Sequence, residues 1–187
     1  MAKEIKNENA EAVAEAVSKT ELFFTENKKV LLTVLAVILV AGAAFFCWHK
    51  FINQPKVEEA QAQMALAEAN FRNAADSTGY ALALRGDGNV LGFEQIIDEY
   101  GSKAGTSVYF YAGICEYNLK NYSQAISYLK SYKGKEDILA ARALACIGDC
   151  QVNMDDLKGA ISSFEKAASK ADNMFAADYL LKAGIAA

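Results

Sequence analysis

The side chains best suited to chemistry are four cysteines, one histidine and a few carboxylates. Cys146 and Cys150 lie four residues apart, so both fall on one face of a helix and could supply half of a metal site. The only histidine, His49, is distant in sequence from these two cysteines and lies at the end of an apolar segment. A Cys/His zinc site is therefore not predicted. We therefore expect Cys115, Cys146 and Cys150 to be small buried packing residues, with no metal and no cofactor.

The remaining short motifs do not indicate catalysis. Asp155-Asp156 lies at a tight turn, where a solvated helix cap is favoured over an acid–base pair. Arg85-Gly86-Asp87 is an integrin-type tripeptide of a kind that arises by chance, and Asp87-Gly88-Asn89 lacks the other ligands of a calcium loop. Asn121-Tyr122-Ser123 is a glycosylation sequon only in a eukaryotic secretory pathway. With no Ser/His or Cys/His pairing and no phosphate-binding glycine loop, we do not expect an enzyme.

An uncharged apolar segment near the N-terminus, Val30 to Trp48, sets the location of the protein. As a helix it would be roughly 28 Å long, close to the ~30 Å hydrocarbon core of a bilayer. We predict a single transmembrane helix over residues 30–48 that contacts the lipid bilayer. A cleaved signal peptide is the alternative, because Ala41-Gly42-Ala43 resembles a cleavage site. However, 29 residues precede the segment and its apolar character continues past that site.

The distribution of basic residues around this segment predicts its orientation. Lys28 and Lys29 abut it on the N-terminal side, whereas Lys50 and Lys56 are the only basic residues that follow before Arg72. The excess favours a cytoplasmic arm over residues 1–29, with the rest of the chain across the membrane. The whole chain has 19 basic and 23 acidic residues, and its net charge of −4 gives no basic surface for nucleic acid.

The segment after the span reads as an all-α domain, because it is rich in alanine and the chain has a single proline. Residues 49–105 are predicted to be a linker and leading helices. One helix runs from Lys56 to Ala75, with Val57, Ala60, Met64, Ala67 and Phe71 on its apolar face. A turn over residues 86–89 precedes a second helix that ends at Gly101.

From residue 106 onward the chain repeats itself. Gly113 and Gly148 are 35 residues apart, as are Ala125 and Ala160, and a third start occurs at Leu180-x2-Ala183-Gly184. A glycine where two helices cross, followed by Ala-x3-Leu or Ala-x3-Phe on the second helix, is typical of closely packed antiparallel pairs. The period is close to the 34 residues of a tetratricopeptide repeat. We therefore predict a transmembrane helix followed by a tetratricopeptide α-solenoid over residues 106–187.

The repeats depart from the standard pattern. Glu116, Gln151 and Ala187 stand where an aromatic residue is expected, and Asp137 and Asp172 replace the closing proline, so we expect both to be helix N-caps. Residue 187 falls within the first helix of the third, incomplete repeat. Its apolar face would be covered by a continuation of the chain or by a partner, and we expect the continuation.

Stacked pairs of this kind present a concave surface formed by their first helices, which is where a partner would bind. The residues predicted to line this groove are Phe110, Ile114, Tyr117 and Asn118 in the first pair, and Arg142, Asp149, Val152 and Asn153 in the second. An apolar, aromatic groove suits a hydrophobic helix or extended segment. Alternatively, Phe110 and Tyr117 pack internally against Phe93 and Ile97.

The arm, span, leading helices and repeats together resemble the YfgM-like tetratricopeptide proteins of the bacterial inner membrane. The segments 86–94 (GDGNVLGFE) and 111–114 (YAGI) look like the Bacteroidetes branch of that family. The resemblance implies an accessory, chaperone-like subunit of the SecYEG translocon with a periplasmic repeat domain. It also implies a PpiD-like chaperone and secreted client polypeptides as partners. A scaffold for envelope assembly or stress signalling that holds a different membrane complex is the alternative, and a purely structural role is a third.

Overall fold

The computed structural model describes residues 23–170 and 175–187, and in these ranges the chain is helical with no strand. Contacts divide it into two compact units, Met1–Asn53 and Gln54–Ala187. The all-α prediction is thus confirmed. The predictions made for most of the N-terminal arm and for an N-cap at Asp172 fall outside the described residues.

The first unit contains the apolar helix α2 (Lys28–Trp48), followed by a π-helical turn, η1 (His49–Asn53). The helical stretch beginning at Lys28 is long and apolar enough to cross a membrane, and no part of its most apolar window is buried against the rest of the chain. Thr33 carries the only side-chain hydroxyl in α2, and it donates to the Lys29 carbonyl at 2.8 Å. This bond leaves no unpaired hydroxyl on a helix that would contact lipid.

The second unit begins with leading helices that pack against α6. Their bounds are α3 (Gln54–Asn73), α4 (Ser77–Arg85), α5 (Phe93–Tyr100) and the 3-10 turn η2 (Gly101–Ala104). Ala60, Met64 and Ala67 are buried, which confirms the predicted apolar face of α3. The ring of Tyr111 stacks on Phe93 with centroids 5.3 Å apart and an interplanar angle of 11°, so α6 is fixed against α5.

The turn between α4 and α5 is built around Asp87. Its Oδ1 accepts hydrogen bonds from the backbone N–H groups of Asn89 and Val90, each at 2.9 Å. The Val90 and Asn89 bonds lower the pKa of the Asp87 carboxyl, because they favour its charged form. Gly86 and Gly88 have φ of 76° and 89°, a region that side chains rarely adopt. The predicted turn is confirmed, and the Asp87 carboxylate stabilises it by accepting these two backbone hydrogen bonds.

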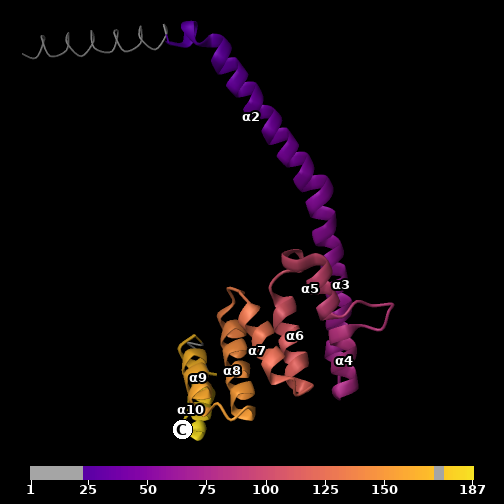
Figure 1. The fold of residues 1–187 in the computed structure, drawn as a ribbon, viewed down its shortest axis with the longest axis vertical. Coiled ribbons are helices and arrows are strands. Elements are labelled where there is room, and N and C mark those ends of the chain that lie inside the picture. The colour runs from indigo at the N-terminus through magenta and orange to yellow at the C-terminus, as the bar shows by residue number, and fades with distance from the viewer. Residues whose placement is uncertain (1–22, 171–174) are drawn as a thin grey trace, which may run out of the picture. The chain divides into compact units, whose positions relative to one another are not determined.

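Five helices that lie side by side complete the second unit (Figure 1). They are α6 (Ser107–Asn118), α7 (Tyr122–Ser131), α8 (Asp137–Asn153), α9 (Leu157–Lys170) and α10 (Ala176–Ala186). The α6–α7 and α8–α9 pairs are joined by the same turn, 35 residues apart. Asn121 N–H donates to the Glu116 carbonyl, and Asp156 N–H donates to the Gln151 carbonyl, both at 2.9 Å. The residues just before these donors share a φ of 65°: Lys120 and Asp155.

Both crossing glycines lie where the two helices of a pair meet. A Cβ on Gly113 would be 2.6 Å from Leu129 Cγ, and a Cβ on Gly148 would be 2.6 Å from Phe164 Cε1. Neither distance is tolerated between carbon atoms, so a side chain at either position would force Leu129 or Phe164 to shift. The prediction of tight crossings is confirmed. A Cβ on Gly184, the third glycine of the pattern, would meet no atom within 4 Å.

The predicted helix caps have mixed outcomes. Asp156 caps α9, since its Oδ1 accepts the Gly159 N–H at 3.0 Å, as expected for a turn carboxylate. The predicted cap at Asp137 is wrong. Asp137 is the first residue inside α8, and Glu136 is the N-cap without a side-chain capping bond. The Asp137 carboxylate instead pairs with Lys170 Nζ at 3.2 Å.

Candidate partner-binding site

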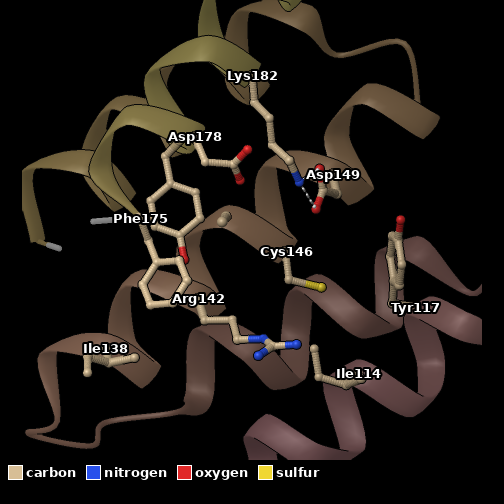
Figure 2. Close-up of a pocket in the computed structure, with 11 residues that line it drawn as sticks. Ile114, Tyr117, Ile138, Arg142, Cys146, Asp149, Phe175, Asp178 and Lys182 are labelled. Atoms are coloured by element: carbon tan, nitrogen blue, oxygen red, sulfur yellow. Dashed lines mark hydrogen bonds and ion pairs between the residues drawn. The ribbon is translucent and has the colours of Figure 1, made fainter. Parts of the chain in front are cut away.

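The first helices of the two pairs and α10 together enclose a hollow of about 390 Å³, shown in Figure 2. We call it the α6–α8–α10 hollow. Its lining residues are Ile114 and Tyr117 from α6, Ile138, Arg142, Ala145, Cys146 and Asp149 from α8, and Phe175, Asp178, Tyr179 and Lys182 at α10.

Helical spacing explains how α8 contributes most of the wall. Arg142, Cys146 and Asp149 follow one another at intervals of four and three residues, so they share one face of the helix. Another side of α8 packs through Gly148 against Phe164, which fixes the rotation of the helix. The packing of α8 on α9 therefore decides which α8 residues face the hollow.

The lining is partly apolar and aromatic. Ile138 and Phe175 are exposed, whereas Tyr117 is half-buried with its ring 6.0 Å from that of Tyr122. Burial raises the pKa of the Tyr117 hydroxyl, and the Asp149 carboxylate adds to the shift. Tyr117 therefore stays neutral at physiological pH, when its hydroxyl can donate a hydrogen bond.

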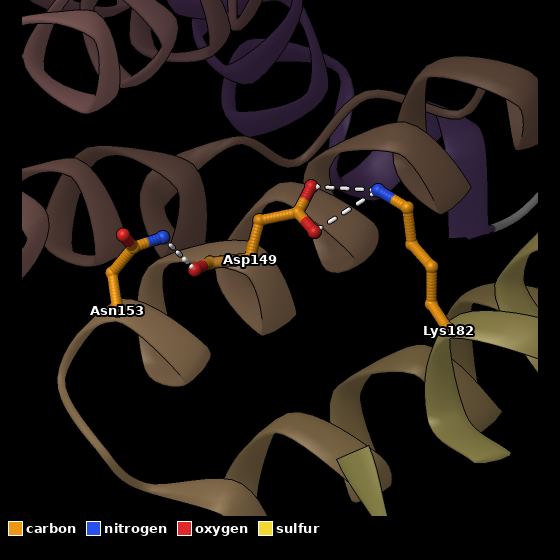
Figure 3. A network of polar contacts seen from close by, with 3 residues as sticks. All are labelled: Asp149, Asn153 and Lys182. Atoms are coloured by element: carbon orange, nitrogen blue, oxygen red, sulfur yellow. Dashed lines mark hydrogen bonds and ion pairs between the residues drawn. The ribbon is translucent and has the colours of Figure 1, made fainter. Parts of the chain in front are cut away.

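An ion pair links α8 to α10 at one side of the hollow (Figure 3). Lys182 Nζ donates to both carboxylate oxygens of Asp149 at 3.0 Å. The same Nζ lies 5.7 Å from the centroid of the Phe164 ring, within cation–π range. The two charges neutralise each other, so neither is left to attract a ligand.

Two other charged groups line the hollow without such a partner. Arg142 and Asp178 are both exposed, and neither forms a hydrogen bond or ion pair with another residue of the described ranges. In Figure 2 the Arg142 guanidinium and the Asp178 carboxylate lie on different sides of Cys146. The hollow thus presents one free positive and one free negative group.

The cysteines act as packing residues, as predicted. Cys115, Cys146 and Cys150 are free thiols and are buried. The Cys146 thiol donates to the Cys150 sulfur, and this bond, together with burial, raises the pKa of Cys146, so its thiol is protonated at neutral pH. Within residues 23–170 and 175–187, no three His, Cys, Asp or Glu side chains gather in a way that could hold a metal ion.

Four of the eight residues predicted for the groove line the hollow: Ile114, Tyr117, Arg142 and Asp149. Val152 lies instead on a neighbouring depression of about 250 Å³ that also includes Leu157 and Ile185. Asn118 and Asn153 do not line the hollow. Their side-chain amides donate to the carbonyls four residues back on their own helices, each at 2.8 Å.

Phe110 is a correction to the predicted groove. It is only 6% exposed and belongs to the core between α6, α7 and α8, with its ring 5.8 Å from that of Tyr132. The alternative of internal packing is confirmed for Phe110, but its neighbours differ from those expected, because the α6 ring that stacks on Phe93 is Tyr111. The helix is rotated so that Phe110 faces the next pair and Tyr111 faces the leading helices.

The sequence analysis did not predict that α10 residues such as Asp178 and Lys182 line the groove, although the glycine spacing could have indicated it. The glycine pattern continues from Gly148 to Gly184, an interval of 36 residues. The same interval places Asp178 at the position of Arg142 and Lys182 at that of Cys146. Extending the register to a third helix would therefore have placed both α10 side chains in the groove.

Fold and site together define a class of protein: a helical chain with a membrane-length apolar helix and duplicated helix pairs that enclose a hollow. No family model, curated protein or solved structure matches the chain.

Proposed function

We propose that the protein is a membrane-anchored scaffold of the tetratricopeptide type that binds a partner in the α6–α8–α10 hollow. The observation that carries the proposal is the duplication of the helix pair. Two turns with the same backbone hydrogen bonds, 35 residues apart, are followed by a further helix that closes the hollow. Stacked pairs of this kind form extended binding surfaces.

The anchor in this proposal is α2, in the inner membrane of a bacterium. The N-terminal arm lies in the cytoplasm and the helix pairs lie in the periplasm. Lys28 and Lys29 support this orientation, because basic residues next to a span are retained on the cytoplasmic side.

The role we propose is an accessory, chaperone-like subunit of the SecYEG translocon that works beside a PpiD-like chaperone on secreted chains. The apolar part of the hollow supports this role, because an emerging polypeptide exposes apolar side chains that a folded protein would bury. The protein acts by binding, not by catalysis.

Photo-cross-linking in native membranes tests this role. A photoreactive phenylalanine analogue in place of Tyr117 lies in the hollow, and the same analogue in place of Ser127, which is exposed on α7, is the matched control. We expect adducts with translocon subunits, a periplasmic chaperone or secreted chains from position 117 only. Adducts with a different envelope complex would favour the alternative scaffold, and equal labelling from both positions would refute the binding role of the hollow.

A further inference from the structure

We propose that the α6–α8–α10 hollow selects peptide segments in which an apolar side chain lies between an acidic and a basic residue. Arg142 pairs with the acidic residue and Asp178 with the basic one. This inference rests on the proposed function, since it specifies the ligand of the same site.

The apolar requirement follows from the size and lining of the hollow. Its volume of about 390 Å³ falls in the range of about 300–1,000 Å³ typical of ligand pockets. Ala145 and Cys146 are buried residues of its lining, and the side chains of Ile114 and Tyr117 stand beside them. An apolar side chain seated there would displace water from carbon and sulfur surfaces, which is favourable.

The charge requirement follows from which groups are already paired. Asp149 and Lys182 neutralise each other through two contacts of 3.0 Å, whereas Arg142 and Asp178 have no ion-pair partner within the described ranges. A uniformly acidic segment would be attracted by Arg142 and repelled by Asp178, and a uniformly basic one would meet the reverse. A segment of mixed charge satisfies both, so the charges provide specificity more than affinity.

Arginine at position 142 suits this role. Its planar guanidinium can donate two parallel hydrogen bonds to a carboxylate and can also stack on an aromatic ring. Arg142 and Asp178 come from different helices and lie on different sides of Cys146 in Figure 2. The bound segment therefore runs across the hollow from α8 to α10, with its apolar side chain between the two charges.

Fluorescence anisotropy with defined peptides tests the selection, using the full chain in lipid nanodiscs. Four capped, labelled peptides share a Leu-Ala-Leu core and differ in their flanking residues: Glu and Lys, Lys and Glu, Glu and Glu, or Lys and Lys. We expect one of the two mixed-charge orders to bind the wild-type protein about three- to tenfold more tightly than either like-charged peptide, as suits partly exposed ion pairs.

Charge reversal supplies the decisive comparison. Arg142→Glu should shift the preference to the peptide flanked by two lysines, and Asp178→Lys should shift it to the peptide flanked by two glutamates. Lys166→Glu makes the same change of charge as the first variant on an exposed part of α9 and should keep the wild-type preference. Unchanged preferences in both hollow variants, or equal binding of all four peptides, would overturn the inference. If the peptide preferences fail in this way while cross-linking from position 117 persists in Arg142→Glu, the charge selection is refuted and the scaffold function is retained.

Discussion

The crossing glycines give the sharpest test of the helix-pair register, through Gly148→Leu. A Cβ at position 148 would lie 2.6, 2.8 and 2.9 Å from three atoms of the Phe164 ring. Phe164 is 1% exposed and belongs to the core that α8, α9 and α10 share, so a shift of its ring disturbs that core. A leucine side chain must then displace the ring or separate α8 from α9.

The size of the effect combines two opposing contributions. Overpacking a well-packed core costs about 1–3 kcal/mol, and the geometry at Phe164 favours the upper end. Replacing glycine by leucine inside a helix stabilises the folded state by about 0.8 kcal/mol, because leucine has the higher helix propensity. We therefore expect Gly148→Leu to lower the free energy of unfolding by about 2 kcal/mol.

Gly184→Leu is the matched control, since a Cβ there meets no atom within 4 Å. With no overpacking, the propensity gain remains, and we expect a change between zero and about 0.8 kcal/mol of stabilisation. Urea titration with pulsed thiol labelling measures both variants, because Cys115 and Cys150 are fully buried and react only after unfolding. A Gly148→Leu protein as stable as Gly184→Leu would refute the proposed crossing of α8 and α9.

Three further predictions concern topology, the hollow and pH. A topology reporter fused after Ala187 should be active only when exported; activity confined to the cytoplasm would reverse the orientation and exclude a periplasmic site. Tyr117→Ala should weaken partner capture while lowering stability by less than about 2 kcal/mol, measured by the same urea titration, because the side chain is half-buried at the hollow. Burial, with the Glu116 and Glu94 carboxylates, raises the pKa of Cys115 to about 12. The protonated thiol therefore stabilises the fold below about pH 8.5, and this contribution is lost at up to about 1.4 kcal/mol per pH unit as the pH rises toward 12. Cys115→Ala should flatten that dependence, and an unchanged slope would contradict the assignment.

The main elements of the fold could be read from local patterns. An uncharged segment of membrane length, a 35-residue period and glycines at fixed positions are properties of the chain itself, and the structure keeps them as α2, the duplicated turns and the two crossings. Apolar spacing likewise located the buried face of α3, because a helix places every third or fourth residue on one side. Helix boundaries were predicted less accurately: the helix expected from Lys56 to Ala75 spans Gln54–Asn73, and Asp137 begins α8 instead of capping it.

The composition of the hollow was decided by tertiary packing. The sequence places Phe110, Ile114 and Tyr117 on neighbouring parts of α6, but only contacts with α7 and α8 rotate Phe110 into the core and leave the other two at the hollow. The 36-residue interval places Asp178 and Lys182 on the matching face of α10, but they reach the hollow only because α10 packs beside α8 and α9. Periodicity fixes which residues share a helix face, whereas the direction of that face depends on side chains far away in the sequence.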